Sequence, residues 1–112
     1  MKSNVTVVIV TYNGGGGLRI TLEKYEEQTI KPDTLIIVNN ASKDGTYEFV
    51  EEWKMQKGAF KRFVIHSETN VGGAGGFSIG IKEAMNLDNE FIFLSDDDAV
   101  PNVDMLERIN YL

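Results

Sequence analysis

Stretches of consecutive apolar residues alternate along the chain with segments in which apolar residues recur every three or four positions. The continuous stretches occupy residues 5–11, 34–38, 63–65 and 91–94, and most of their side chains are β-branched or aromatic. Continuous runs of this kind, as opposed to alternating ones, are typical of strands that are covered on both faces. The pattern therefore predicts four buried strands.

Helical periodicity fills the segments between and after these strands. The second helix has several N-cap candidates in residues 42–46, and Pro101 can start the fourth. Tyr25 and Trp53 fall on apolar faces and are expected in the core. The residues that mark the four helical faces are Leu18, Leu22 and Tyr25; Tyr47, Val50 and Trp53; Phe77, Ile81, Ala84 and Met85; and Met105, Ile109 and Leu112.

The resulting order, in which strands and helices alternate four times, predicts the fold class. Such alternation indicates an α/β protein with three α/β/α layers, a mostly parallel, Rossmann-like sheet and right-handed crossovers. The 112 residues suit one domain, residues 1–112. The last helical pattern runs to Leu112 without a Gly or Pro stop, so we expect the front part of a longer protein.

Composition narrows the classes of function. The formal net charge of −6 without a Lys/Arg cluster argues against nucleic acid as a partner. Because no basic patch is available, a phosphate ligand would need another counter-charge, such as a divalent cation. The absence of cysteine excludes disulfides and thiolate chemistry. Because the first apolar run is too short for a membrane span and lacks a signal-peptide pattern, we expect a cytoplasmic protein. Membrane association of the intact protein stays open.

Polar or glycine-rich segments follow all four predicted strands, at the edge where open parallel sheets bind ligands. The sharpest of them is the acidic run Asp96, Asp97 and Asp98. Three adjacent carboxylates repel one another, and Mn²⁺ or Mg²⁺, which prefers oxygen ligands and substrate phosphates, would relieve this repulsion. If strand geometry continues, Asp96 and Asp98 point the same way and Asp97 elsewhere. A solvated acidic turn is the plain structural alternative.

The other three segments carry groups suited to a nucleotide. The side chains of Asn39 and Asn40 can donate to and accept from the amide group of a base such as uracil or thymine. The purely structural alternative is an Asx turn that involves Asp44 and leads into the helix. Gly73 and Gly76 belong to a glycine-rich stretch before the third helix that allows close approach of backbone to a ligand, or simply close helix–sheet packing.

A second glycine run, residues 14–17, is interpreted as a mobile loop near the site or a plain flexible turn. Neither glycine run fits the dinucleotide fingerprint or the P-loop. His66, the only histidine, receives no role.

Together these segments resemble glycosyltransferase family 2, the inverting enzymes of the GT-A fold. The match consists of VVIVTYN at residues 7–13, VNNASKDGT at 38–46, NVGGAGG at 70–76 and FLSDDD at 93–98, and it covers essentially the whole chain. The double-glycine loop followed by three aspartates looks most like the branch that contains rhamnosyltransferases and galactofuranosyltransferases.

The resemblance implies roles for individual residues. Thr11, Tyr12 and Asn13 match the segment that lines the nucleotide pocket, and Asn39 and Asn40 match the one that contacts the pyrimidine. Residues 96–98 match the segment that holds the metal and the diphosphate: Asp96 and Asp98 as metal ligands, Asp96 and Asp97 beside the nucleotide.

Two departures from the family pattern stand out. The family usually has Asp where this chain has Asn39, and a basic residue that is often found near Ile79 is absent.

The implied donor is a UDP- or dTDP-sugar, and the implied acceptor is a glycan or a lipid-linked molecule. The family's catalytic base, an Asp or Glu, lies well after the metal motif, so we expect it beyond Leu112. In the intact enzyme that base would deprotonate an acceptor hydroxyl, which attacks the anomeric carbon while the metal stabilises the departing diphosphate.

Two other classes of function stay open. A sugar nucleotidyltransferase would share the architecture, but it usually carries a basic, glycine-rich loop after the first strand, which residues 13–19 match poorly. A non-catalytic nucleotide-binding or interaction module would make the acidic run and the glycine loops incidental. Whatever its function, a truncated α/β domain could expose apolar surface and form a homo-oligomer.

Overall fold

The computed structural model describes residues 3–110 as one sheet with four helices around it. Each strand is followed by a helix, as the sequence predicts. The elements are β1 (Val5–Thr11), α1 (Gly15–Glu26), β2 (Thr34–Asn40), α2 (Thr46–Met55), β3 (Lys61–Ser67), α3 (Gly72–Ala84), β4 (Phe91–Asp96) and α4 (Met105–Asn110).

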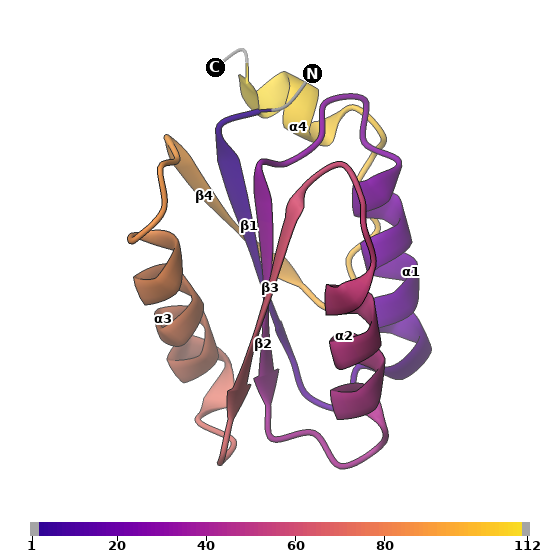
Figure 1. Cartoon of the computed structure of the whole chain (residues 1–112), viewed down its shortest axis with the longest axis vertical. Helices are drawn as coiled ribbons and strands as arrows, with labels where there is room; N and C mark the ends of the chain where they lie inside the picture. The colour runs from indigo at the N-terminus through magenta and orange to yellow at the C-terminus, as the bar shows by residue number, and fades with distance from the viewer. Residues whose placement is uncertain (1–2, 111–112) are drawn as a thin grey trace.

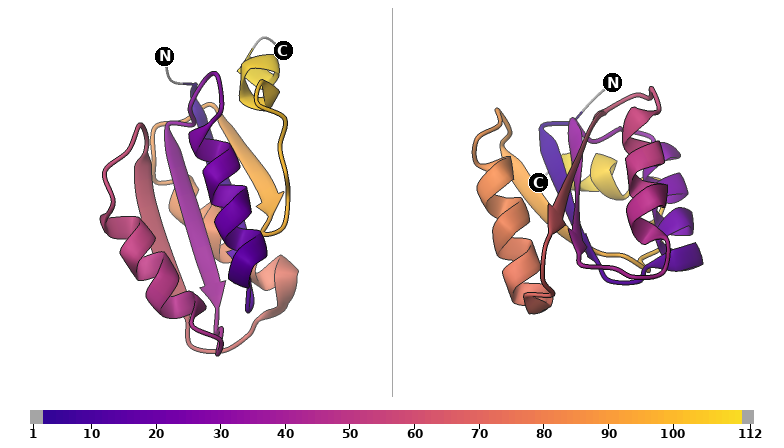
Figure 2. Two further views of the ribbon diagram at one scale, coloured as in Figure 1. Left: turned by 90° about the vertical axis from the view of Figure 1, so that its right-hand side faces the viewer. Right: turned by 60° about the horizontal axis from the view of Figure 1, so that its bottom comes forward.

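All four strands are parallel, in the spatial order β3-β2-β1-β4. The chain moves outward from β1 to β3 and then returns to the other side of β1, so the strand order reverses between β1 and β4. Helices α1 and α2 cover one face and α3 covers the opposite face (Figures 1 and 2). This arrangement confirms the predicted three-layer α/β/α class with a parallel sheet, and it places the switch point, where such folds bind ligands, beside β1.

Burial follows position in the sheet. The central strands β1 and β2 are buried almost throughout, as predicted. The prediction of buried strands is wrong for β3 and β4, which are largely half-buried or exposed because they form the edges of the sheet. Side chains of β1 alternate between two cores: Val7 and Ile9 pack under α1 and α2, and Val8 packs under α3. Tyr25 and Trp53 lie in the first of these cores, as expected.

Several predicted helical details are wrong. Helix α4 begins at Met105 and not at Pro101, and the predicted position Leu112 lies outside the described residues. Met85 and Tyr47 are exposed instead of core-facing. The run Gly15–Gly17 forms the first turn of α1 and not a mobile loop, and α3 likewise starts within its glycines, at Gly72.

The segment after β4 runs back along α1 to α4, which lies at the opposite end of the sheet from the strands' carboxyl ends (Figure 1). The buried Gln28 side chain fixes this return, since its amide donates to the Asn102 carbonyl and accepts from the Leu106 N–H. Among residues 3–110, no helix has the length and apolar character needed to cross a bilayer.

Candidate functional site

The carboxyl ends of β1 and β4 meet at a short hydrogen bond. The Thr11 hydroxyl donates to the Asp97 carboxylate at 2.8 Å, although 86 positions separate the two residues. Alternation along the parallel strands explains the contact: Val10 pairs with Asp96, so the next residue of each strand faces the side covered by α1. Asp97 therefore points toward β1.

A buried threonine of α1 fixes the loop that carries the acidic run. The Thr21 hydroxyl lies 2.9 Å from the Asp97 carbonyl and 2.6 Å from the Ala99 carbonyl, in addition to the carbonyl of Gly17 in its own helix. Sequence reasoning missed Thr21 because its partners are main-chain atoms 76 and 78 positions away. The loop is consequently braced on both sides of Asp98.

Asp96 and Asp98 are exposed, in contrast to the half-buried Asp97. None of the ion pairs within residues 3–110 involves either of them. No three His, Asp or Glu side chains in that range are gathered closely enough to hold a metal by themselves. A pair of free carboxylates nevertheless fits Mg²⁺ or Mn²⁺, because such ions take one or two protein carboxylates and complete their shell with substrate phosphates and water.

Gly14, the residue before α1, has a packing reason. A Cβ atom there would lie 2.2 Å from the Thr11 hydroxyl and 3.3 Å from the Asp97 carboxylate. A Cβ at Gly17 would make only ordinary contact, 3.5 Å from the Asp98 Cβ, and one at either of the two preceding glycines would meet nothing within 4 Å. Close packing against the acidic loop therefore accounts for Gly14 alone.

The loops after β1 and β2 are joined to each other. The Asn13 N–H donates to the Ser42 hydroxyl at 2.9 Å, and the Asn13 side-chain oxygen accepts from the Lys43 N–H at 2.8 Å. Asn13 adopts a positive φ of 52°, which asparagine tolerates better than most residues. Its neighbour Tyr12 is about half exposed, so its ring is accessible.

Asn39 and Asn40 are both buried but face opposite sides of the sheet. The Asn40 amide donates to the Gly72 carbonyl and accepts from the Val71 N–H, both at 2.9 Å. Asn40 therefore joins β2 to the start of α3, a role that sequence reasoning did not assign to it.

Asn39 points to the opposite side, where its amide lies 3.1 Å from the His66 ring. His66 in turn lies 2.7 Å from Glu51 and is stacked on Tyr47, with ring centroids 3.9 Å apart. Sequence reasoning gave His66 no role. The available signal was its place at the end of β3, but the pairing of Asn39 with His66 across the sheet is a property of the register.

Asp44 forms the predicted Asx turn at the start of α2. Its carboxylate accepts from the Thr46 N–H at 3.1 Å and from the Thr46 hydroxyl at 2.5 Å. The hydroxyl bond to Thr46 lowers the pKa of Asp44 below its usual value. Asp44 also lines a cavity of about 270 Å³ together with Gly15 and Arg19.

The two glycines predicted beside the nucleotide differ in their surroundings. A Cβ at Gly76 would lie 2.6 Å from a methyl group of Val10, and one at Gly80 would lie 2.3 Å from a methyl group of Val8. These residues, one helical turn apart, bring α3 close to β1 and account for Gly76 by packing. Gly73, by contrast, is exposed with open space around it.

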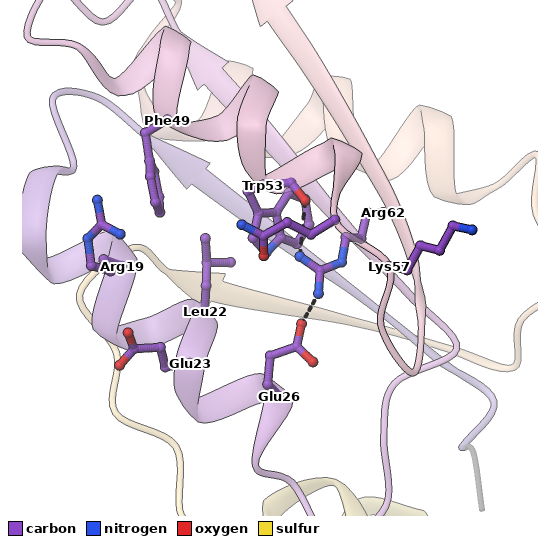
Figure 3. A pocket seen from close by; sticks show the side chains of 9 residues that line it. Arg19, Leu22, Glu23, Glu26, Phe49, Trp53, Lys57 and Arg62 are labelled. Carbon is purple, nitrogen blue, oxygen red and sulfur yellow. Dashed lines mark hydrogen bonds and ion pairs between the residues drawn. The ribbon is translucent and has the colours of Figure 1, made fainter.

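A separate groove of about 380 Å³ lies between α1 and α2 (Figure 3). At its centre the almost fully buried Arg62 pairs with Glu26, bonds the Trp53 carbonyl at 3.1 Å and stacks over the Trp53 ring. These contacts join α1, α2 and β3. The groove shares only Arg19 and Phe49 with the cavity beside Asp44 and contains none of the predicted site residues.

Comparison with known proteins agrees with this geometry. The sequence profile described as glycosyl transferase family 2 matches residues 6–110. The galactofuranosyltransferase GlfT1 of Mycolicibacterium smegmatis is 34% identical over 97 residues, which cover 87% of this chain and 30% of that protein. The O-antigen chain rhamnosyltransferase RfbN of Salmonella typhimurium is 31% identical over 109 residues, 96% of this chain and 32% of RfbN.

Solved structures share the fold. TarS of S. aureus, crystallised with UDP, superposes with a TM-score of 0.78 at 25% identity, covering 97% of this chain and 31% of that one. The mannosyltransferase PcManGT from Pyrobaculum calidifontis, in complex with GDP-Man and Mn²⁺, gives a TM-score of 0.83 at 22% identity over 99% of this chain and 32% of that one. The chain thus spans about a third of the length of the relatives it matches. The chain belongs to glycosyltransferase family 2 and has the GT-A fold of that family.

Proposed function

We propose that this chain binds the nucleotide-sugar donor of a glycosyltransferase, with a UDP- or dTDP-sugar as the donor. The observation that carries the proposal is the acidic loop, which is braced against β1 and α1 at the point where the strand order reverses. The bound UDP in the TarS structure and the Mn²⁺ in the PcManGT structure support the two ligand classes.

In this proposal some residues around the loop bind the metal and others contact the nucleotide. Asp96 and Asp98 ligate Mn²⁺ or Mg²⁺, which neutralises the donor's diphosphate. Asp97 lies beside the nucleotide and orients Thr11. Tyr12, Asn13 and Asp44 line the nucleotide pocket, and Asn39 reads the pyrimidine. The remaining predicted contacts act mainly through the backbone of α3: Asn40 positions it, and Gly73 and Gly76 form part of it.

We propose transfer with inversion to a glycan or lipid-linked acceptor, in a cytoplasmic protein, with the base supplied by a residue beyond Leu112. The two carboxylates free for a metal favour this function over a non-catalytic module. Because Gly15–Gly17 are helical, they do not favour the phosphate loop of a nucleotidyltransferase.

Thermal unfolding tests the proposal. Mn²⁺ together with UDP or dTDP at about 100 times the dissociation constant should stabilise the fold by about 2.7 kcal/mol and raise the Tm by about 10 °C or more. Asp98→Ala should abolish the shift, because one metal ligand is lost. Asp88→Ala, at an exposed acid before β4, is the matched control and should keep it. A Tm unmoved by either pyrimidine nucleotide with Mn²⁺ would refute the proposal.

A further inference from the structure

A continuous chain of hydrogen bonds connects the end of β2 to the surface of α2. We call it the histidine relay, formed by Ser42, Asn39, His66, Glu51 and Lys54. The Ser42 N–H donates to the Asn39 oxygen at 3.2 Å, and the Asn39 nitrogen lies 3.1 Å from His66 Nδ1. His66 Nε2 lies 2.7 Å from a Glu51 oxygen, and the Lys54 ammonium donates to Glu51 at 3.0 Å.

The donors and acceptors of the relay fit together in only one direction. A main-chain N–H can only donate, so the atom of the Asn39 amide that faces Ser42 is the oxygen. The amide nitrogen, which also only donates, therefore faces His66, and His66 Nδ1 must carry a lone pair. The ring proton then lies on Nε2 and is donated to Glu51. The neutral Nε2–H tautomer of His66 is thus fixed from both sides.

The imidazole has little freedom to leave this arrangement. Tyr47 stacks on it with an interplanar angle of 23°, and Glu51 holds its far edge. The hydrogen bond from His66, followed by that from Lys54, lowers the pKa of Glu51 below its usual value, so Glu51 stays ionised as an acceptor. His66 therefore presents a fixed acceptor to Asn39.

Asn39 lines a cavity of about 390 Å³ together with Ala41, Tyr47 and His66. After its two contacts within the relay, the amide retains one hydrogen and one lone pair for a ligand. Uracil and thymine present a donor at N3 and an acceptor at O4, whereas cytosine presents an acceptor at N3 and a donor at N4. An amide that turns freely by 180° serves both patterns, but an amide of fixed orientation serves only one.

We propose that His66 is a specificity-determining residue, which locks the Asn39 amide in the orientation that accepts uracil or thymine and rejects cytosine. The inference rests on the proposed function, since it assumes that Asn39 faces the base. His66 acts through Asn39 and is a positioning residue. Without an acceptor at position 66, only the Ser42 N–H opposes a turned amide, and discrimination weakens.

Calorimetric titration of this chain with UDP and with CDP, each in the presence of Mn²⁺, tests the inference. The wild type should bind UDP about tenfold or more tightly than CDP, since one correctly oriented bidentate pair discriminates between bases to this extent. His66→Phe keeps a stacking ring but has no acceptor, and its UDP/CDP ratio should fall to about threefold or less. His66→Asn restores an acceptor oxygen near the position of Nδ1 and should restore most of the ratio.

Glu68→Gln is the matched control, because Glu68 lines the same cavity outside the relay, and it should leave the ratio unchanged. If His66→Phe does not fold, Glu51→Leu tests the same lock by removing the group that fixes the tautomer, and it should lower the ratio. A wild type that binds neither nucleotide would overturn the proposed function and this inference with it. UDP binding with a ratio that His66→Phe leaves at the wild-type value would overturn this inference alone.

Discussion

The two halves of the sheet's carboxyl edge differ in the burial and hydrogen bonding of their polar side chains. On the β2–β3 half, the amides of Asn39 and Asn40 are buried and each is bonded to protein on both its oxygen and its nitrogen. On the β1–β4 half, Asp96 and Asp98 are exposed, and no cation within the described residues pairs with them. On the first half the protein itself bonds each buried amide, whereas the second half carries like charges that a ligand would have to neutralise.

This difference separates the side chains whose loss should destabilise the free protein from those whose loss should not. A buried polar group whose hydrogen bonds are all made stabilises the fold, because its removal leaves its partners without a hydrogen bond. An exposed group among like charges contributes nothing to the fold and can be selected for binding alone. Substitutions on the β2–β3 half should therefore lower the stability of the free protein, and those at Asp96 and Asp98 should not.

The largest effect is expected at Asn40. Asn40→Ala removes both bonds to the start of α3 and leaves the Val71 N–H and the Gly72 carbonyl without their partner. We expect the free energy of unfolding to fall by about 1–3 kcal/mol, since each lost hydrogen bond contributes about 0.5–1.5 kcal/mol. Chemical denaturation in urea measures the change. A loss below about 0.5 kcal/mol would mean that the buried amide of Asn40 does not stabilise the free protein.

A smaller effect is expected at Thr21, which braces the acidic loop from α1. Thr21→Val keeps the shape but removes the hydroxyl that lies near the Asp97 and Ala99 carbonyls. The free energy of unfolding should fall by about 1–2 kcal/mol, and the Mn²⁺-dependent response to UDP should weaken as the loop loosens. Thr21→Ser retains the hydroxyl and serves as the control. Equal stability of the Val and Ser variants would contradict the bracing role.

The smallest effect is expected at Asp98 in the absence of metal and nucleotide. Asp98→Asn removes one of the three adjacent charges without removing any hydrogen bond found among residues 3–110. The free energy of unfolding should stay within about 0.5 kcal/mol of the wild type, or rise slightly. Thermal unfolding with excess chelator measures it, and Asp97→Asn, which disturbs the bond from Thr11, provides the contrast. A marked loss at Asp98 would erase the distinction between the two halves.

Much of the architecture follows from local patterns. The continuous apolar runs locate all four strands, although only β1 and β2 are covered almost throughout, as such runs predict. The positions of the strands depend only on residues close in the chain. The prediction that Asp96 and Asp98 point the same way assumed that strand geometry continues, but β4 ends at Asp96 and residues 97–98 form a turn. Asp97 does bond to Thr11, but the turn and not strand alternation sets the direction of Asp98.

Other local patterns misled. The glycine runs suggest loops, since glycine is a poor helix former, yet both form the first turns of helices. The glycines of the two first turns, residues 15–16 and 72–73, have open space around them, but Gly76 and, one turn later, Gly80 allow α3 to touch Val10 and Val8. The energetic cost of glycine in a helix is offset there by close packing that only the assembled sheet makes available.

The sequence by itself determined the order of the elements, the positions of the strands and the acidic run that follows the fourth strand. The tertiary structure alone decided which polar groups meet one another. The pairing of Asn39 with His66 depends on the register of β2 against β3, and that of Thr21 with Asp97 on how α1 docks. Periodicity reports the environment of a residue, but it contains no information about a partner many positions away, because that partner is fixed only when the whole core packs.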